Sequence, residues 1–101
     1  MKQVQQAEEI SNIAFGFMAS KALFVALHCN LFSLLSNKPL SSNDLADLVQ
    51  VPENRISTIC TALTSIGLLK RIDGMYKNSI GAEKYLVKGA KYDFGDYLRL
   101  Q

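Results

Sequence analysis

The stretch that decides the fold is residues 40–78, LSSNDLADLVQVPENRISTICTALTSIGLLKRIDGMYKN. Its first part predicts the start of a helix. Ser41 is placed as the N-cap and Asp44 stands at the third helical position, which is the arrangement of a capping box. Leu40 and Leu45 flank the cap with the spacing of a hydrophobic staple. We expect a short helix from residue 42 to about residue 49, with these inward-facing residues: Leu45, Ala46, Leu48 and Val49.

A second helix follows after a short break. Pro52 is suited to a helix start, and Glu53 places a negative charge at the positive end of the helix dipole. Gly67 is a natural C-terminal stop. Apolar residues recur between them at helical spacing: Ile56, Ile59, Cys60, Leu63 and Ile66. Two helices joined by a tight turn, the second one longer, predict a helix-turn-helix.

The hydrophobic period changes after the second helix. Residues 68–72 and 75–78 read as two strands, and Asp73-Gly74 between them is a typical two-residue hairpin turn. A helix-turn-helix followed directly by a hairpin predicts a winged helix.

Length and composition place limits around this core. The chain has 101 residues, of which 49% are hydrophobic, and 11 cationic and 9 anionic side chains give a net charge of +2. This length fits one domain, residues 1–101, and is too short for a nucleotide-binding doubly wound sheet, whose Gly-rich phosphate loop is absent from the sequence. Two cysteines cannot form a disulfide framework, which favours a reducing, cytoplasmic compartment. The fold class expected is mainly α.

The N-terminal residues 5–36 predict two or three helices, with Gly16 as a plausible bend. Their apolar residues are too many for a single stripe, so the helices must be buried on more than one side. Lys21 and His28 within the segment argue against a membrane span. A second copy of the chain is the expected cover, and we predict a homodimer whose interface includes Phe15, Phe17, Met18, Phe24, Leu27 and Phe32.

The C-terminal residues 79–101 read as further helices. One is expected from residue 79 to residue 87, and Asp93 is placed to cap a last one.

Several segments, read together, carry a resemblance to a known module. They are residues 22–27, 31–32, 39–41, 44–46, 63–69 and 82–86, with Arg71 and Tyr76. In their order and residue types they resemble the N-terminal dimerisation domain of class I S-adenosylmethionine-dependent O-methyltransferases, the plant phenolic and bacterial antibiotic-tailoring enzymes. The likeness runs from about residue 10 to the end and rests on apolar positions, turns and helix ends.

This resemblance implies a division of the chain and a role. Residues 5–36 would be dimerisation helices, residues 40–78 the winged-helix core, and residues 79–101 helices leading to a separate catalytic domain. S-adenosylmethionine would belong to that domain, so the resemblance assigns no catalytic, cofactor-binding or metal residue here. The first helices of the family often help to line the pocket for the small-molecule acceptor, for which Phe15 and Met18, and also His28, are the candidates.

No other group of residues predicts catalytic chemistry. His28 is the single histidine and cannot build a metal site or a triad alone. Cys29 and Cys60 lack the spacing of metal ligands and are interpreted as packing residues.

A winged-helix DNA-binding regulator is the alternative function. The outward face of the second helix should then read bases, yet it offers little beyond Asn54 and Arg55, since Thr and Ser occupy the rest. The wing is basic, but a two-residue turn places Lys70 directly opposite Lys77, which is unfavourable without an anion between them. We therefore regard nucleic acid as an unlikely partner. A stand-alone helical adaptor is a third possibility.

Overall fold

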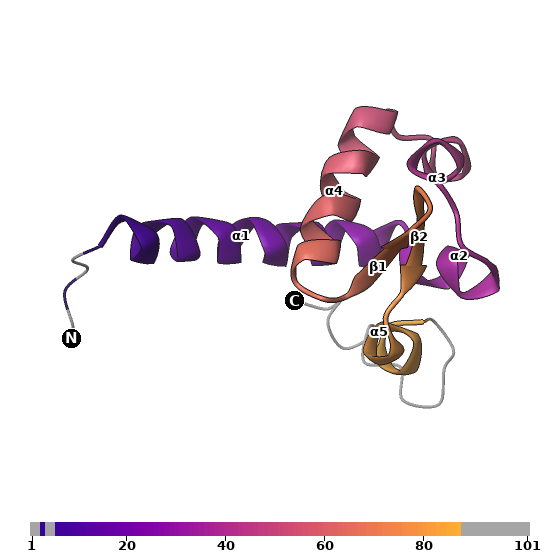
Figure 1. Ribbon diagram of the computed structural model, residues 1–101. Coiled ribbons are helices and arrows are strands. Elements are labelled where there is room, and N and C mark those ends of the chain that lie inside the picture. The colour runs from indigo at the N-terminus through magenta and orange to yellow at the C-terminus, as the bar shows by residue number, and fades with distance from the viewer. Residues whose placement is uncertain (1–2, 4–5, 88–101) are drawn as a thin grey trace.

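The computed structural model describes residue 3 and residues 6–87, and the helix expected after Asp93 lies outside them. Within that part, five helices and one two-stranded sheet follow one another along the chain, which confirms the mainly α fold class (Figure 1). They are α1 (Ala7–His28), α2 (Leu31–Asn37), α3 (Ser42–Val49), α4 (Glu53–Ser65), β1 (Leu69–Ile72), β2 (Met75–Asn78) and α5 (Ile80–Tyr85).

The N-terminal segment forms two helices, and the break between them lies elsewhere than expected. Helix α1 continues through Gly16, so the bend predicted there was wrong; a single glycine is tolerated within a helix. The chain turns instead at Asn30, whose φ of 58° is left-handed and whose backbone N–H donates to the Leu27 carbonyl at 3.2 Å. Asn adopts this conformation more readily than most residues, and this allows α2 to pack back against α1.

The helix-turn-helix is confirmed together with its cap. The Asp44 N–H donates to Ser41 Oγ at 3.1 Å, and the Ser41 N–H donates to Asp44 Oδ2 at 3.4 Å, so both halves of the capping box are present. Helix α4 begins after Pro52 and ends before Gly67, whose φ of +87° is the left-handed stop that glycine supplies without strain.

Two residues expected inside this core lie at its surface. Leu48 is 58% exposed, because Leu45, Ala46 and Val49 form the inner face of α3 and Leu48 lies about 100° around the helix from that face. Ile66 is 40% exposed, because it follows the last turn of α4 as its C-cap.

The wing is an antiparallel hairpin in the predicted register. Asp73 and Gly74 have positive φ values of 52° and 78°, as a type I′ turn requires, and Lys70 lies opposite Lys77. Tyr76 also pairs with Leu40 ahead of α3, donating to its carbonyl at 2.7 Å and accepting from its N–H at 3.1 Å. The wing is thereby tied to the start of the helix-turn-helix.

The core lies where α1 crosses α4 and where α2 contacts the hairpin. Its most deeply buried large side chains are Leu27, Leu31, Phe32, Leu45, Ile56, Cys60 and Leu63. Asn78 joins three elements at its edge, since its Nδ2 donates to the Phe32 carbonyl at 2.8 Å and to Glu83 Oε1 at 2.9 Å. Ser36 Oγ donates to the other oxygen of Glu83. These bonds fix α2, β2 and α5 against one another.

Candidate dimerisation surface

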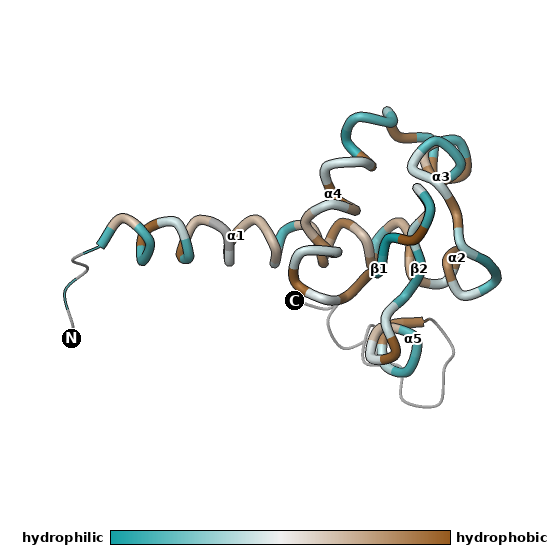
Figure 2. The backbone as a smooth tube through the Cα atoms, viewed as in Figure 1, coloured by the Kyte–Doolittle hydropathy of each residue, from teal (hydrophilic) through white to brown (hydrophobic). Residues whose placement is uncertain are grey.

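The first part of α1 extends away from the rest of the molecule (Figure 1). We call residues 7–18 the projecting half and residues 19–28 the inner half. Along the projecting half the hydropathy colours of the backbone vary between brown, white and teal, so apolar and polar residues are mixed in its sequence (Figure 2). Four of its large apolar side chains face solvent, with exposed fractions of 61% for Ile10, 65% for Ile13, 71% for Phe17 and 55% for Met18. A soluble domain rarely presents so much contiguous apolar surface unless another molecule covers it.

Helix α1 is also long and apolar enough, by length and composition alone, to cross a membrane. Of its most apolar 18-residue window, 18% is buried inside the chain. The helix therefore lacks the cover that a core helix of a soluble protein obtains from its own chain. A second protein surface would supply it.

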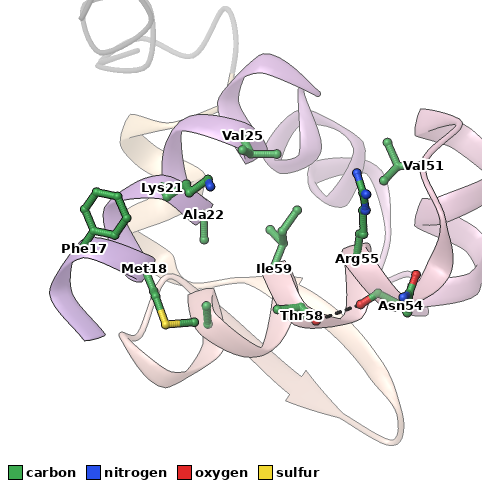
Figure 3. A pocket seen from close by; sticks show the side chains of 11 residues that line it. Phe17, Met18, Lys21, Ala22, Val25, Val51, Asn54, Arg55, Thr58 and Ile59 are labelled. Atoms are coloured by element: carbon green, nitrogen blue, oxygen red, sulfur yellow. Dashed lines mark hydrogen bonds between the residues drawn. The ribbon is translucent and has the colours of Figure 1, made fainter. Parts of the chain in front are cut away.

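A groove lies between α1 and α4, beside the base of the projecting half (Figure 3). Its volume is about 650 Å³. Helix α1 contributes Phe17, Met18, Lys21, Ala22 and Val25, and the other side is formed by Val51, Asn54, Arg55, Thr58, Ile59 and Ala62. Seven of its eleven lining residues are apolar, and it is a trough open to solvent between two helices. Such a trough suits a third helix packed along the first two.

The charges of the groove are all positive. Lys21 and Arg55 are both exposed on it, and its lining includes no carboxylate. Within the described residues, neither cation has an ion pair or a side-chain hydrogen bond of its own. The polar contact in the wall is internal to α4, where Thr58 Oγ1 donates to the Asn54 carbonyl at 2.9 Å.

This lining does not fit S-adenosylmethionine. The cofactor carries a sulfonium cation, which Lys21 and Arg55 would repel, and its ribose hydroxyls call for a carboxylate that the groove does not offer. Glycine-rich backbone at the end of a parallel strand is also missing from the described residues, whose two strands form a hairpin. We therefore derive no step of methyl transfer from this chain.

The residues expected in the dimer interface fall into two groups. Phe17 and Met18 are exposed and line the groove. Leu27 and Phe32 are each 1% exposed and belong to the core of the chain itself, so they keep no surface for a partner. Phe24 is half-buried against that core, and the side chain of Phe15 lies outside the described part of the molecule.

Two exposed residues were missed as interface candidates. Ile10 lies about two turns before Phe17 on the projecting half, Ile13 lies about one turn before it, and both are more than half exposed. Ile13 and Phe17 follow Ile10 by three and seven residues, and this helical spacing was a usable signal. It was overlooked because the bulkier phenylalanines dominate the apolar count of this segment.

The candidates for other chemistry remain packing or surface residues. His28 is exposed at the end of α1 and is not among the residues that line the groove. Cys60 is fully buried, and burial raises the pKa of its thiol to about 12, which keeps it neutral and unreactive at physiological pH. The described residues contain no cluster of His, Cys, Asp and Glu suited to a metal ion.

The DNA-binding alternative finds no support in this geometry. Asn54, Arg55 and Thr58, which would have to face base edges, line the groove against α1. A recognition helix enters the major groove with its polar face clear of its neighbours. Here that face is shared with another helix.

Comparison with known proteins identifies the module. A family model described as an O-methyltransferase dimerisation domain matches residues 11–88. The chain is similar to the 3-hydroxy-5-methyl-1-naphthoate 3-O-methyltransferase of Streptomyces sahachiroi, with 29% identity over 90% of this chain and 26% of that protein. It is also similar to the tetracenomycin polyketide synthesis 8-O-methyl transferase TcmO of Streptomyces glaucescens, with 31% identity over 91% of this chain and 27% of the relative.

The fold also occurs in solved structures. The human N-acetylserotonin methyltransferase, solved in complex with S-adenosylmethionine, superposes with a TM-score of 0.82 at 24% identity, over 98% of this chain and 31% of that one. The chain thus spans about a quarter of the length of the curated relatives it matches.

Proposed function

This chain belongs to the O-methyltransferase dimerisation domain family, and we propose that it holds together two copies of an S-adenosylmethionine-dependent methyltransferase as a non-catalytic part of that enzyme. The observation that carries the proposal is the projecting half of α1. The side chains of Ile10, Ile13, Phe17 and Met18 there are more than half exposed, and the described residues leave them uncovered.

The energetic argument for a homodimer is direct. Burying a large apolar side chain is favourable by about 1.5–3 kcal/mol. In a monomer this free energy is not gained at four positions, Ile10, Ile13, Phe17 and Met18. The sum is a large part of the 5–15 kcal/mol that typically stabilises a domain. Pairing two copies covers all four in each chain. Twofold symmetry allows one surface to serve both partners, without any further complementary site.

The chemistry is assigned to another part of a longer protein. The relatives are about four times as long as the segment they share with this chain, and the groove does not suit the cofactor. We propose that a C-terminal domain binds S-adenosylmethionine and transfers the methyl group. The small-molecule acceptor would be a hydroxyl compound, by analogy with the two Streptomyces relatives.

A contribution to the acceptor pocket is the finer part of the proposal. Met18 supports this part of the proposal, because it lines the groove and also a second hollow bounded by Thr61 and Ser65. Methionine adapts its shape to varied apolar ligands. His28 is exposed outside both hollows, and we leave it out of the pocket.

Sedimentation equilibrium at low micromolar concentration tests the dimer. The 11.2 kDa chain should sediment at twice its own mass. Phe17→Asp should shift it to a folded monomer, because a carboxylate would be buried in the apolar interface. Ile80→Asp is the matched control, since Ile80 is 80% exposed on α5, outside both hollows, and the change should leave the mass unaltered.

A monodisperse 11.2 kDa wild-type chain would contradict the proposal. A chain that stays soluble only with detergent or lipid vesicles would contradict it as well, and would assign α1 to a membrane.

A further inference from the structure

The hairpin leaves one edge of its sheet open. Tyr76 of β2 pairs both its N–H and its C=O with Leu40, so these groups point away from β1. Arg71 lies directly opposite Tyr76, and two opposite residues of an antiparallel pair direct their backbone groups either toward each other or both outward. The N–H and C=O of Arg71 therefore point out of the sheet at the edge of β1. Within the described residues, no backbone group pairs with them there.

The outer face of the hairpin, which we call the wing face, combines positive charge with apolar surface. Lys70 lies opposite Lys77, and the next pair on this face toward the turn is Ile72 and Met75. All four side chains are exposed, to 54% for Ile72 and 43% for Met75. Neither lysine has an ion pair among the described residues. The wing face therefore presents two unpaired cations beside two uncovered apolar side chains.

This combination exceeds what protection of an edge strand requires. A lysine on an edge strand commonly prevents pairing with other chains. One lysine serves that purpose, whereas a second one directly opposite destabilises the hairpin, and exposed Ile72 and Met75 oppose the protection. A second copy of β1 at this edge would bring its own Lys70 and Arg71, which is repulsive. A partner that fits the edge must carry negative charge.

We propose that the free edge of β1 binds an extended, acidic segment of another protein, which adds to the sheet as a third strand. The backbone of the segment pairs with the outward N–H and C=O of Arg71. On the wing face a carboxylate lies beside Lys70 and an apolar side chain lies beside Ile72, two residues or about 6.6 Å further along the strand. A nucleic acid backbone would match the lysines alone and would leave Ile72 and Met75 uncovered.

The wing face is independent of the proposed dimer. None of its residues lines the groove or the second hollow, and Arg71 lines neither of them. Binding at the edge of β1 should therefore leave the sedimentation equilibrium of the chain unchanged. A probe that alters the mass of the assembly would contradict binding at this edge.

A synthetic peptide tests the proposal on the whole chain. The probe is Ser-Thr-Val-Thr-Glu-Thr-Val-Thr-Ser, whose symmetric sequence offers an acid beside Lys70 and an apolar side chain beside Ile72 in either strand direction. Followed by NMR of the backbone amides, it should shift the Arg71 N–H saturably and slow the exchange of this amide with solvent. A probe with lysine in place of the central glutamate should bind about two- to fivefold more weakly, the range for a surface ion pair.

The backbone of Arg71 can be tested apart from its side chain. Arg71→Pro removes the outward N–H and no hydrogen bond of the hairpin, since proline is accepted in an edge strand where its nitrogen faces outward. This variant should lose binding of the probe. Arg71→Thr is the matched control, because it lacks the guanidinium, keeps the N–H and should still bind.

Methylated probes give the same test with the wild-type chain, should Arg71→Pro fail to fold. An added strand directs alternate N–H groups toward β1. Of two probes methylated on the two alternating sets of backbone nitrogens, one should therefore lose binding and the other should keep it.

Exchange of charge tests the acidic character of the partner. Lys70→Glu should weaken binding of the glutamate probe about two- to fivefold, and this variant should prefer the lysine probe. Lys38→Glu makes the same change of charge on the other side of the hairpin, ahead of Leu40, and should leave the affinity for the glutamate probe unchanged.

Four results would overturn the proposal. The absence of a saturable shift at the Arg71 N–H would leave the lysines as protection of the edge alone. Equal binding of both methylated probes would exclude strand addition. An affinity that Lys70→Glu does not change would exclude an acidic partner at this position. A shift of the same amides by duplex DNA at physiological salt would assign the wing face to nucleic acid.

Discussion

The two halves of α1 belong to one continuous helix and have opposite surroundings. The inner half buries Ala22, Ala26 and Leu27 against α2 and α4, while the projecting half exposes Ile10 and Phe17. Their sequences are similarly apolar. What separates them is whether the chain has an element of its own to place against the helix. Helix α4 reaches as far as the groove at Phe17 and Met18, and no described element lies beside the N-terminal turns of α1 (Figure 1).

This difference teaches that an apolar helix can serve two purposes at once. Its inner half forms part of the core of the protomer, and its projecting half is available to a second copy. Substitutions in the two halves should therefore separate protomer stability from association.

Leu27→Ala should have the largest effect. Removing a side chain that is 1% exposed costs about 2–5 kcal/mol, so the melting temperature should fall by about 10 °C or more at every protein concentration. Phe17→Ala, at 71% exposure, is the comparison. It should keep the melting temperature of the dilute chain and remove the rise in melting temperature with concentration that a dimer produces. Equal losses of protomer stability would contradict the distinction between the halves.

Cys60 lies in the winged-helix body, residues 40–78, and gives the next largest contrast, which is one of chemical reactivity. With its pKa raised to about 12 from 9.0, its thiolate fraction at pH 8 falls about a thousandfold, whereas Cys29 is half-buried at the end of α1. Iodoacetamide should modify Cys29 and leave Cys60 intact until the chain unfolds. Modification of Cys60 at the same rate as Cys29 would show that the body opens readily.

The same pKa predicts a loss of stability at high pH. The folded state holds the Cys60 proton more tightly than the unfolded state, so this contribution is complete below pH 9 and is lost as pH rises toward 12. Denaturant titrations of the wild type and Cys60→Ala between pH 8 and pH 11 should show the steeper decline in the wild type. Parallel curves would contradict the shift.

The winged-helix body could be predicted from sequence because its signals are local. The capping box at Ser41, the stop at Gly67 and the Asp73-Gly74 turn each depend on residues that are close together in the chain, and all three are present in the structure. Local hydrogen bonds and allowed backbone angles decide these features, so tertiary context changes them little.

The sequence predicts that the N-terminal helices form an apolar interface, but it does not predict which side chains are exposed for it. Helical periodicity shows that a side chain is apolar, but it does not show which neighbour will cover it. Phe32 and Leu27 were therefore assigned to a partner although α2 folds back and buries them, while Ile10 and Ile13 were overlooked. The turn between α1 and α2 depends on the left-handed conformation of Asn30. A single asparagine in the sequence does not predict this conformation.

Ser41→Ala tests the start of the helix-turn-helix. It removes the acceptor of the Asp44 N–H and should lower the free energy of unfolding by about 0.5–2 kcal/mol, measured by denaturant titration. Asn43→Ala, at an exposed position in the same turn, is the control and should change little. Dimerisation should be unaffected by either variant, because α3 contributes no residue to the groove.

Lys77→Glu should produce the smallest effect, and a favourable one. It replaces the repulsion with Lys70 directly opposite by an attraction across the strand pair, which should stabilise the wing by about 0.2–1 kcal/mol at low salt. The gain should shrink as salt is added. A loss of stability would indicate that an anion normally bridges the two lysines.

Amide hydrogen exchange along α1, followed as the chain is diluted, tests the central claim most directly. We predict that the amides of the projecting half, residues 7–18, are protected from exchange at high protein concentration. They should lose this protection when the concentration falls below the dissociation constant of the dimer, while the amides of the inner half stay protected throughout. Protection of the projecting half that does not change with concentration, or its absence at every concentration, would show that a second copy does not cover it.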